Sequence, residues 1–211
     1  VAAKIAALEG GVAAMLTSSG QAASFYAVFN ICEAGDHFIS SSTIYGGTYN
    51  LFGVTMKKMG IECTFIDPDA SDEEIEKAFR PNTKCFFGET ISNPGGIVFD
   101  IERFARIAHS HGVPLIVDNT FATPINCRPF EWGADIVTHS TTKYMDGHAT
   151  AVGGCIGVLI PTSSPDSAHP MKAIMDLLTQ RALVKWLISR RLRHNSCATS
   201  EASKVQRMRS C

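Results

Sequence analysis

The sequence predicts an α/β protein with three layers, in which a mostly parallel β-sheet lies between two layers of helices. Three observations support this fold class. Apolar runs of strand length alternate with amphipathic segments of helical length from residue 1 to about residue 158. These apolar runs are continuous, which is typical of parallel strands buried on both faces. The chain has 211 residues, 45% of them hydrophobic, which is enough for a sizeable core.

The first half of the pattern gives three helices and three strands. The Ala-rich segment 1–8 is predicted to be a helix that ends at Gly10 and Gly11. A helix over residues 48–59 should end at Gly60, because glycine readily adopts the left-handed conformation that follows many helices. The other elements of this half are a helix at 21–32 and strands at 13–17, 37–41 and 62–66.

The second half begins with a helix-start signal. Ser71 and Glu74 have the spacing of a capping box, in which each side chain bonds a backbone N–H at the other position. We expect this box to open a helix that runs to Phe79. The remaining predicted elements are a helix at 101–110 and strands at 83–87, 114–117, 135–138 and 152–158.

Polar motifs follow several predicted strands, at the edge of the sheet where ligands bind in folds of this class. The run Ser18–Gln21 opens a helix, whose free N–H groups can bind a phosphate. Tyr45–Thr48 offers an aromatic ring for a planar ligand, beside glycines that allow close approach. Asn93 lies in a turn, with Glu89 just upstream, and can donate a hydrogen bond. Taken alone, Ser18–Gln21 is better explained as a helix cap and Tyr45–Thr48 as a surface turn, and the segment that holds Asn93 is a turn on either interpretation.

Two further stretches carry more specific chemistry. Asp118 ends a buried strand, where a carboxylate is costly unless it is paired. Opposite charges about 4 Å apart gain about 4 kcal/mol at an effective dielectric near 20, enough to keep a pyridine nitrogen protonated. Ser140 and Thr142 place two hydroxyls before Lys143, an amine able to form a Schiff base. Together these groups suit pyridoxal phosphate, although Asp118 by itself could cap a helix or form a loop ion pair.

Composition and spacing argue against several other classes of protein. The apolar runs are broken well before ~18 residues, so we expect no transmembrane helix, and Lys4–Glu9 is too short and acidic for a signal peptide. Seven cysteines without a C-x-x-C pair predict free thiols in the cytoplasm. His109 and His111 lack a third ligand at useful spacing, so we predict a helix end there and no metal site.

Charge is distributed unevenly along the chain. Residues 171–211 carry nine Lys or Arg and two acidic residues, a charge of +7, whereas residues 1–170 carry a charge of −8. A basic tail of this kind can contact nucleic acid or a membrane surface, or it can be a solvated terminus.

In this order, the motifs resemble those of the Cys/Met-metabolism family of pyridoxal phosphate enzymes, which includes cystathionine synthases and lyases, methionine γ-lyase and homocysteine-forming sulfhydrylases. The family pattern runs S-S-G, Y-G-G-T, N-P, V-D-N-T-F and S-x-T-K, and its resemblance to this chain covers about residues 1–157. The runs S-S-G-Q-A-A, E-T-I-S-N-P-G-G and D-I-V-T-H-S-T-T-K-Y are most similar to O-acetylhomoserine sulfhydrylases.

The resemblance implies a truncated large domain of a fold-type I pyridoxal phosphate transferase. Its implied reaction is γ-replacement, in which sulfide or methanethiol displaces acetate from O-acetyl-homoserine. A γ-lyase, or an inactive fragment that binds cofactor, is the alternative. Lys143 and Tyr45 would be catalytic. The implied cofactor-binding residues are Ser19, Gly20, Gln21, Tyr45, Asn93, Asp118, Thr120, Ser140, Thr142 and Lys143.

The resemblance also concerns the parts and partners of the whole enzyme. We expect residues 1–157 to form a partial cofactor-binding domain, without the upstream segment and C-terminal domain of the family. The expected partners are an amino-acid substrate, sulfide or a thiol, and further copies of the chain in a homotetramer, but neither nucleic acid nor membrane. Residues 158–211 are expected to be an atypical, disordered basic tail. The codons that Val184–Trp186 and Asn195–Glu201 require permit family-like sequences one nucleotide away, which suggests a frameshift between about Gly157 and Gln180.

Overall fold

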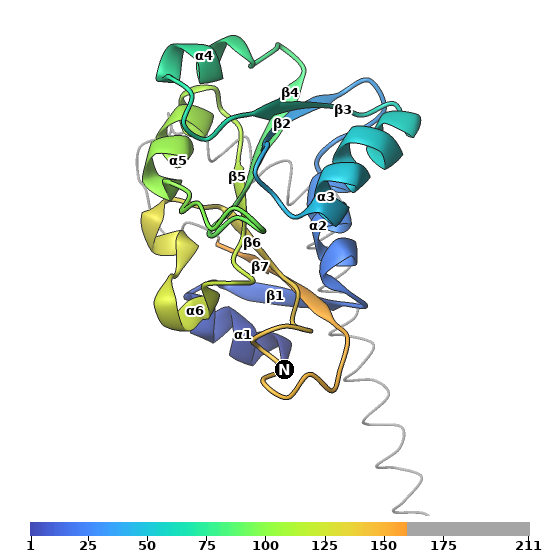
Figure 1. Cartoon of the computed structure of the whole chain (residues 1–211), viewed down its shortest axis with the longest axis vertical. Coiled ribbons are helices and arrows are strands. Elements are labelled where there is room, and N and C mark those ends of the chain that lie inside the picture. Colours follow the sequence, from blue (N-terminus) through green and yellow to red (C-terminus); the bar gives the residue numbers. More distant parts are fainter. Residues whose placement is uncertain (160–211) are drawn as a thin grey trace, which may run out of the picture. The chain divides into compact units, whose positions relative to one another are not determined.

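A computed structural model describes residues 1–159 as a seven-stranded sheet with helices on both sides (Figure 1). The tail predicted after residue 157 lies, from residue 160 onward, outside the described residues. The strands are β1 (Ala13–Thr17), β2 (His37–Ser41), β3 (Glu62–Ile66), β4 (Thr83–Glu89), β5 (Leu115–Asp118), β6 (Ile136–His139) and β7 (Gly154–Val158).

The strand order across the sheet is β1-β7-β6-β5-β4-β2-β3. All pairs from β6 to β3 are parallel, whereas β7 runs antiparallel to both of its neighbours, β6 and β1. Six strands therefore point the same way, and their carboxyl ends lie along one edge. The predicted α/β class with a mostly parallel sheet is confirmed.

The helices form the two outer layers of this fold. Figure 1 shows α2 and α3 on one side of the strands and α4, α5 and α6 on the other. Their bounds are α1 (Ala2–Glu9), α2 (Gly20–Phe29), α3 (Gly46–Asn50), the π-helix η1 (Leu51–Met56), α4 (Asp72–Lys77), α5 (Ile101–Ser110), α6 (Thr123–Asn126) and the 3-10 helix η2 (Pro129–Trp132).

Most of the predicted helix starts and ends are present in the structure. Gly10 and Gly60 have φ angles of 78° and 80°, so both adopt the left-handed conformation after a helix. Ser71 and Glu74 form the capping box at the start of α4. The helix predicted at 48–59 instead begins at Gly46, and its middle part is π-helical.

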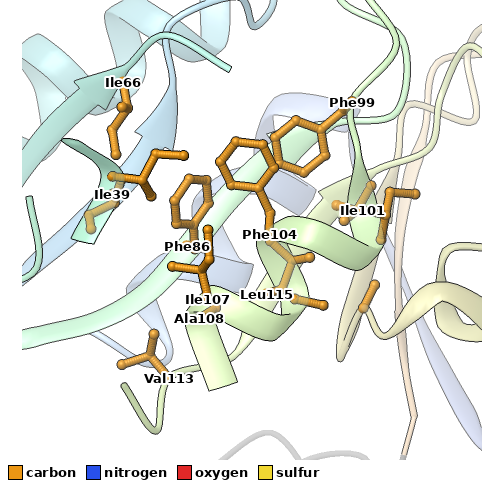
Figure 2. Packing of buried hydrophobic residues seen from close by; sticks show 14 of the residues in the cluster. Ile39, Ile66, Phe86, Phe99, Ile101, Phe104, Ile107, Ala108, Val113 and Leu115 are labelled. Carbon is orange, nitrogen blue, oxygen red and sulfur yellow. The ribbon is translucent and has the colours of Figure 1, made fainter. Parts of the chain in front are cut away.

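The main core packs α5 against the sheet, as Figure 2 shows. The buried face of α5 carries Ile101, Phe104 and Ala108, at the i, i+3, i+7 spacing of an amphipathic helix. The rings of Phe99 and Phe104 stack with centroids 4.3 Å apart, and Phe86 of β4 packs beside Phe104 at 5.0 Å. This core anchors β4 and β5, the two strands that end in carboxylates. Among residues 1–159 no helix has the length and apolar character needed to cross a bilayer.

Candidate functional site

A cavity of about 250 Å³ lies where β1, β2, β4, β5 and β6 end. Loops after these five strands supply its walls, which is the usual place for a ligand in a sheet of this kind. Every cofactor-binding residue that the sequence predicted lines this cavity: Ser19, Gly20, Gln21, Tyr45, Asn93, Asp118, Thr120, Ser140, Thr142 and Lys143.

One end of the cavity is formed by the start of α2. The side chain of Ser19 accepts a hydrogen bond from the N–H of Ala22 at 3.1 Å, and its carbonyl accepts from the N–H of Ala23 at 3.0 Å. The two N–H groups before these, on Gly20 and Gln21, precede the intrahelical ladder and have no partner within it. With the positive end of the helix dipole they make a place for an anion.

Glycine is required at residue 20 because α2 begins directly against the loop after β6. A Cβ atom on Gly20 would lie 2.5 Å from the Cβ of Ser140, closer than any two such atoms can come. Because Gly20 has no side chain, the backbone N–H groups at the start of α2 and the hydroxyl of Ser140 can line the same small space. This arrangement fits a phosphate group.

Two predicted phosphate contacts have additional partners in the protein. Gln21 Nε2 donates to Thr48 Oγ1 at 2.8 Å, which joins the starts of α2 and α3. Thr142 Oγ1 donates to the carbonyl of Gly153 at 3.1 Å and accepts from the N–H of Gly153 at 2.9 Å. The Thr142 hydroxyl thus connects the segment that carries Lys143 to the start of β7 by two hydrogen bonds.

At the other end of the cavity Asp118 is held in a fixed orientation. Its Oδ1 accepts hydrogen bonds from the N–H and the hydroxyl of Thr120, and Thr120 Oγ1 in turn accepts from the N–H of Ser140 at 2.8 Å. Burial raises the pKa of Asp118 above its ordinary value, while the bonds from Thr120 and the charge of His139 oppose this rise. A cationic partner, such as a protonated ring nitrogen, would therefore be favoured beside this carboxylate.

Glu89 is a member of the site to which the sequence assigned no role. Its side chain is buried, and Oε1 accepts a hydrogen bond from the N–H of Tyr45 at 2.8 Å. Burial and the nearby charge of Asp118 raise the pKa of Glu89 to about 8, although backbone N–H groups of Tyr45 and Asn93 oppose the shift. The Glu89 carboxyl accordingly holds a proton at neutral pH. Its place at the end of β4, paired in register with Asp118, was the signal that could have identified it.

Tyr45 and Lys143 keep their side chains accessible. Tyr45 is 49% exposed as a residue, and its ring lies over Gly47, where a Cβ atom would come within 2.5 Å of the ring. Lys143 is also exposed, in the turn after β6, where its N–H donates to the carbonyl of Ser140 at 3.2 Å. The predicted ring and amine therefore stand on the cavity wall within reach of an incoming molecule.

The His109 and His111 pair belongs to the scaffold, as the sequence suggested. His109 Nε2 contacts Asp135 Oδ2 at 2.9 Å, and this bond raises the pKa of His109. The ring of His111 stacks on Phe79 with centroids 4.0 Å apart. No cluster of three potential metal ligands occurs within residues 1–159.

The residues on the cavity wall fit a ligand with an anion at one end and a basic aromatic ring at the other. The N–H groups of Gly20 and Gln21 are available to donate hydrogen bonds to the anion, and Asp118 is available to pair with the ring nitrogen. Two such ends, with an accessible lysine beside them, match the chemistry of pyridoxal phosphate.

Comparisons with known proteins agree with this match. The family model described as Cys/Met metabolism PLP-dependent enzyme matches residues 1–187. Homocysteine/cysteine synthase of Saccharomyces cerevisiae is 51% identical over 154 residues, which are 72% of this chain and 34% of the yeast protein. The chain thus spans about a third of the length of the curated relatives it matches.

Two solved structures share the fold. A protein of Campylobacter jejuni described as an O-acetylhomoserine (thiol)-lyase, containing N'-pyridoxyl-lysine-5'-monophosphate, superposes with a TM-score of 0.74 at 40% identity, over 76% of this chain and 40% of that one. Cystathionine γ-lyase of Lactobacillus plantarum, complexed with L-serine, gives 0.70 at 38% identity, over 74% and 41%.

Proposed function

The chain belongs to the Cys/Met metabolism family of pyridoxal phosphate-dependent enzymes, and on that premise we propose that its cavity binds the cofactor for a γ-replacement. In this reaction sulfide or methanethiol takes the place of acetate on O-acetyl-homoserine, giving homocysteine or methionine. The observation that carries the proposal is the convergence of all ten predicted residues on one cavity. The names of the yeast and C. jejuni relatives favour this reaction within the family.

The cavity would hold the cofactor at its two ends. The N–H groups of Gly20 and Gln21 and the hydroxyl of Ser140 would bind the phosphate, and the Asp118 carboxylate would pair with the ring nitrogen. When bound, pyridoxal phosphate supplies an electron sink for the carbons of an amino-acid substrate. Thr120 keeps Asp118 oriented through its two hydrogen bonds.

Three side chains around the cofactor have separate roles in this proposal. The Lys143 amine would hold the cofactor and, when free of it, would take and return protons at Nζ. Tyr45 lies over the open side of the cavity, where its ring covers the cofactor and excludes water. Glu89 carries its proton at neutral pH, so it adds no second negative charge beside Asp118.

A γ-lyase is the second candidate reaction. It is favoured by the structural similarity to cystathionine γ-lyase of L. plantarum, whose TM-score is close to that of the (thiol)-lyase. The same cofactor-binding residues would serve it, because both reactions begin with proton removal from an amino acid. Its products differ, since no thiol enters at the γ-carbon.

Product analysis of the chain loaded with pyridoxal phosphate separates the candidates. γ-Replacement predicts that O-acetyl-L-homoserine releases acetate at a rate that depends on sulfide, with homocysteine as the second product. Release of 2-oxobutanoate and ammonia from methionine or cystathionine, with no response to sulfide, would instead support the lyase. Cofactor binding with neither product would leave the chain as a binding fragment and refute both reactions for it.

The remaining features of the whole enzyme belong to the same proposal. Residues 1–157 form a partial cofactor-binding domain, which acts in a cytoplasmic homo-oligomer on an amino-acid substrate and sulfide or a thiol. The similarity of this chain to about a third of the yeast relative supports the partial domain.

A further inference from the structure

A buried polar network lies under the cavity, on the α1 side of the sheet. Glu9, the last residue of α1, is fully buried, and its Oε1 accepts a hydrogen bond from Asn119 Nδ2 at 3.0 Å. The same oxygen shares a short hydrogen bond with His139 Nε2. Asn119 Oδ1 accepts from Thr90 Oγ1 at 2.8 Å, and Nδ2 also donates to the carbonyl of Cys127 at 2.9 Å. One carboxylate is thus the centre of a network that is almost completely shielded from solvent.

At the ends of three strands, each residue of this network is next in sequence to a residue of the site. Successive residues of a strand point to opposite faces of the sheet, so a residue next to a cavity residue faces away from the cavity. The three strands involved are neighbours in the sheet and are paired near these positions. Thr90 follows Glu89 at the end of β4, Asn119 follows Asp118 at the end of β5, and His139 precedes Ser140 at the end of β6.

We propose that Glu9 is a positioning residue for the cofactor site, which fixes the spacing between the ends of β4, β5 and β6 from the opposite face. The inference rests on the proposed cofactor function, because it assigns the network a role in holding Asp118 and Ser140. A rigid cofactor bound at both ends requires a constant separation between the groups that bind it. Errors of about 1 Å in such positions cost about 100-fold in function.

At the other ends of β5 and β6, a second buried carboxylate bonds both a histidine and a strand N–H, which provides a matched control. Asp135 Oδ2 accepts from His109 Nε2 at 2.9 Å and from the N–H of Leu115 at 2.8 Å. Asp135 thus joins the start of β6 to α5 and to the start of β5, at the ends of these two strands opposite the cavity. Its loss should weaken the fold without moving the cofactor-binding groups.

The experiment compares Glu9→Ala, Glu9→Gln and Asp135→Ala in the full chain with two readouts. The first needs no cofactor: it is amide hydrogen exchange at Thr120, whose N–H bonds Asp118 Oδ1 at the end of β5, and at Ser140, whose N–H bonds Thr120 Oγ1 from the end of β6. The second is the dissociation constant of pyridoxal phosphate from an absorbance titration. All variants are compared at temperatures where circular dichroism shows equal folding.

Glu9→Ala should speed exchange at both amides and weaken cofactor binding about ten-fold or more. Glu9→Gln keeps an acceptor oxygen and should restore most of both values. Asp135→Ala should speed exchange at Leu115 and leave cofactor affinity unchanged. Unchanged exchange and affinity in Glu9→Ala, or an equal loss of affinity in Asp135→Ala, would overturn the proposal.

Two outcomes need separate interpretation. If the unmodified chain binds no cofactor, the proposed function fails, and the exchange data still decide the network: faster exchange confined to Thr120 and Ser140 supports it, and unchanged or uniform exchange refutes it. If Glu9→Ala does not fold, Thr90→Val keeps Glu9 in place and removes the hydroxyl that donates to Asn119 Oδ1 at 2.8 Å and to the carbonyl of Asp118 at 3.3 Å. A smaller increase at the same two amides then supports the proposal, and no increase overturns it.

Discussion

Asp118 combines partial burial, a fixed orientation and a raised pKa, so its free energy depends strongly on a positive partner. Asp118→Asn keeps the shape and the acceptor oxygen for Thr120 but removes the charge. Charged hydrogen bonds contribute about 1.5–3 kcal/mol, so we predict that the variant binds pyridoxal phosphate about 10- to 100-fold more weakly. An absorbance titration measures the change. The exposed Asp69→Asn is the control, and equal affinity of the two variants would contradict the assignment.

Glu89 should make the stability of the cofactor-free chain depend on pH. Its pKa is about 8 in the folded chain against an ordinary 4.5, so the folded state binds the proton more tightly. The resulting stability is fully present below about pH 4.5 and is lost as pH rises through about 8. Glu89→Gln removes this loss, and should gain on the order of 3 kcal/mol relative to the native chain between pH 5 and pH 9.

Urea unfolding at several pH values tests the effect of Glu89. The exposed Glu102→Gln is the control and should leave the pH dependence unchanged. Parallel stability curves for Glu89→Gln and the native chain would show that Glu89 ionises normally.

At the residue scale, sequence is informative where one position alone dictates the chemistry. Asp118 at the end of a buried strand and Lys143 after paired hydroxyls could both be selected in that way, and both line the cavity. The raised pKa of Glu89 could not be predicted from the sequence, because it depends on burial and on the charge of Asp118 on the neighbouring strand. The proposed role of Glu9 could not be predicted either, because its hydrogen-bond partners lie 110 and 130 residues away in the chain.

At the scale of single elements, the position of α2 depends on a glycine at its start. Gly20→Ala would put a Cβ atom 2.5 Å from that of Ser140, so α2 must shift away from the loop after β6. We predict a loss of cofactor affinity of about 100-fold, because the N–H groups of residues 20 and 21 move with it. Titration with pyridoxal phosphate checks the value.

Gly46→Ala is the matched control for the α2 prediction. Gly46 is likewise the first residue of a helix, but a Cβ atom there would meet nothing within 4 Å. The variant should retain cofactor affinity. An equal effect of the two substitutions would mean that helix-start glycines matter for some reason other than contact with Ser140.

Elements whose signals are local were predictable, and those defined by tertiary contacts were not. The Ser71 capping box and the glycines after α1 and η1 fix their helix ends through neighbouring residues. The buried residues of the π-helix η1, Phe52 and Met56, are four positions apart, a spacing that an α-helix also gives, so the sequence did not distinguish the two. The short helices α6 and η2 are each four residues long, too short to show a period.

At the scale of the whole described chain, the cavity depends on strand order. β1, which leads into Ser19 and Gly20, pairs with β7, and β7 pairs in turn with β6. The end of the cavity that we propose binds phosphate therefore lies beside the Lys143 segment, because β7, the last strand, lies between the first strand, β1, and the sixth strand, β6. Neither this insertion nor the antiparallel direction of β7 can be read from composition, since a buried strand looks alike in either direction.

The central claim, that these loops together bind pyridoxal phosphate through Lys143, is tested most directly by reductive trapping. The chain is incubated with the cofactor and borohydride, digested, and analysed by mass spectrometry, beside Lys143→Ala and the control Lys57→Ala. We predict a phosphopyridoxyl group on Lys143 in the native chain and in Lys57→Ala, and no comparable labelling in Lys143→Ala. Labelling spread over exposed lysines, or undiminished in Lys143→Ala, would contradict the account.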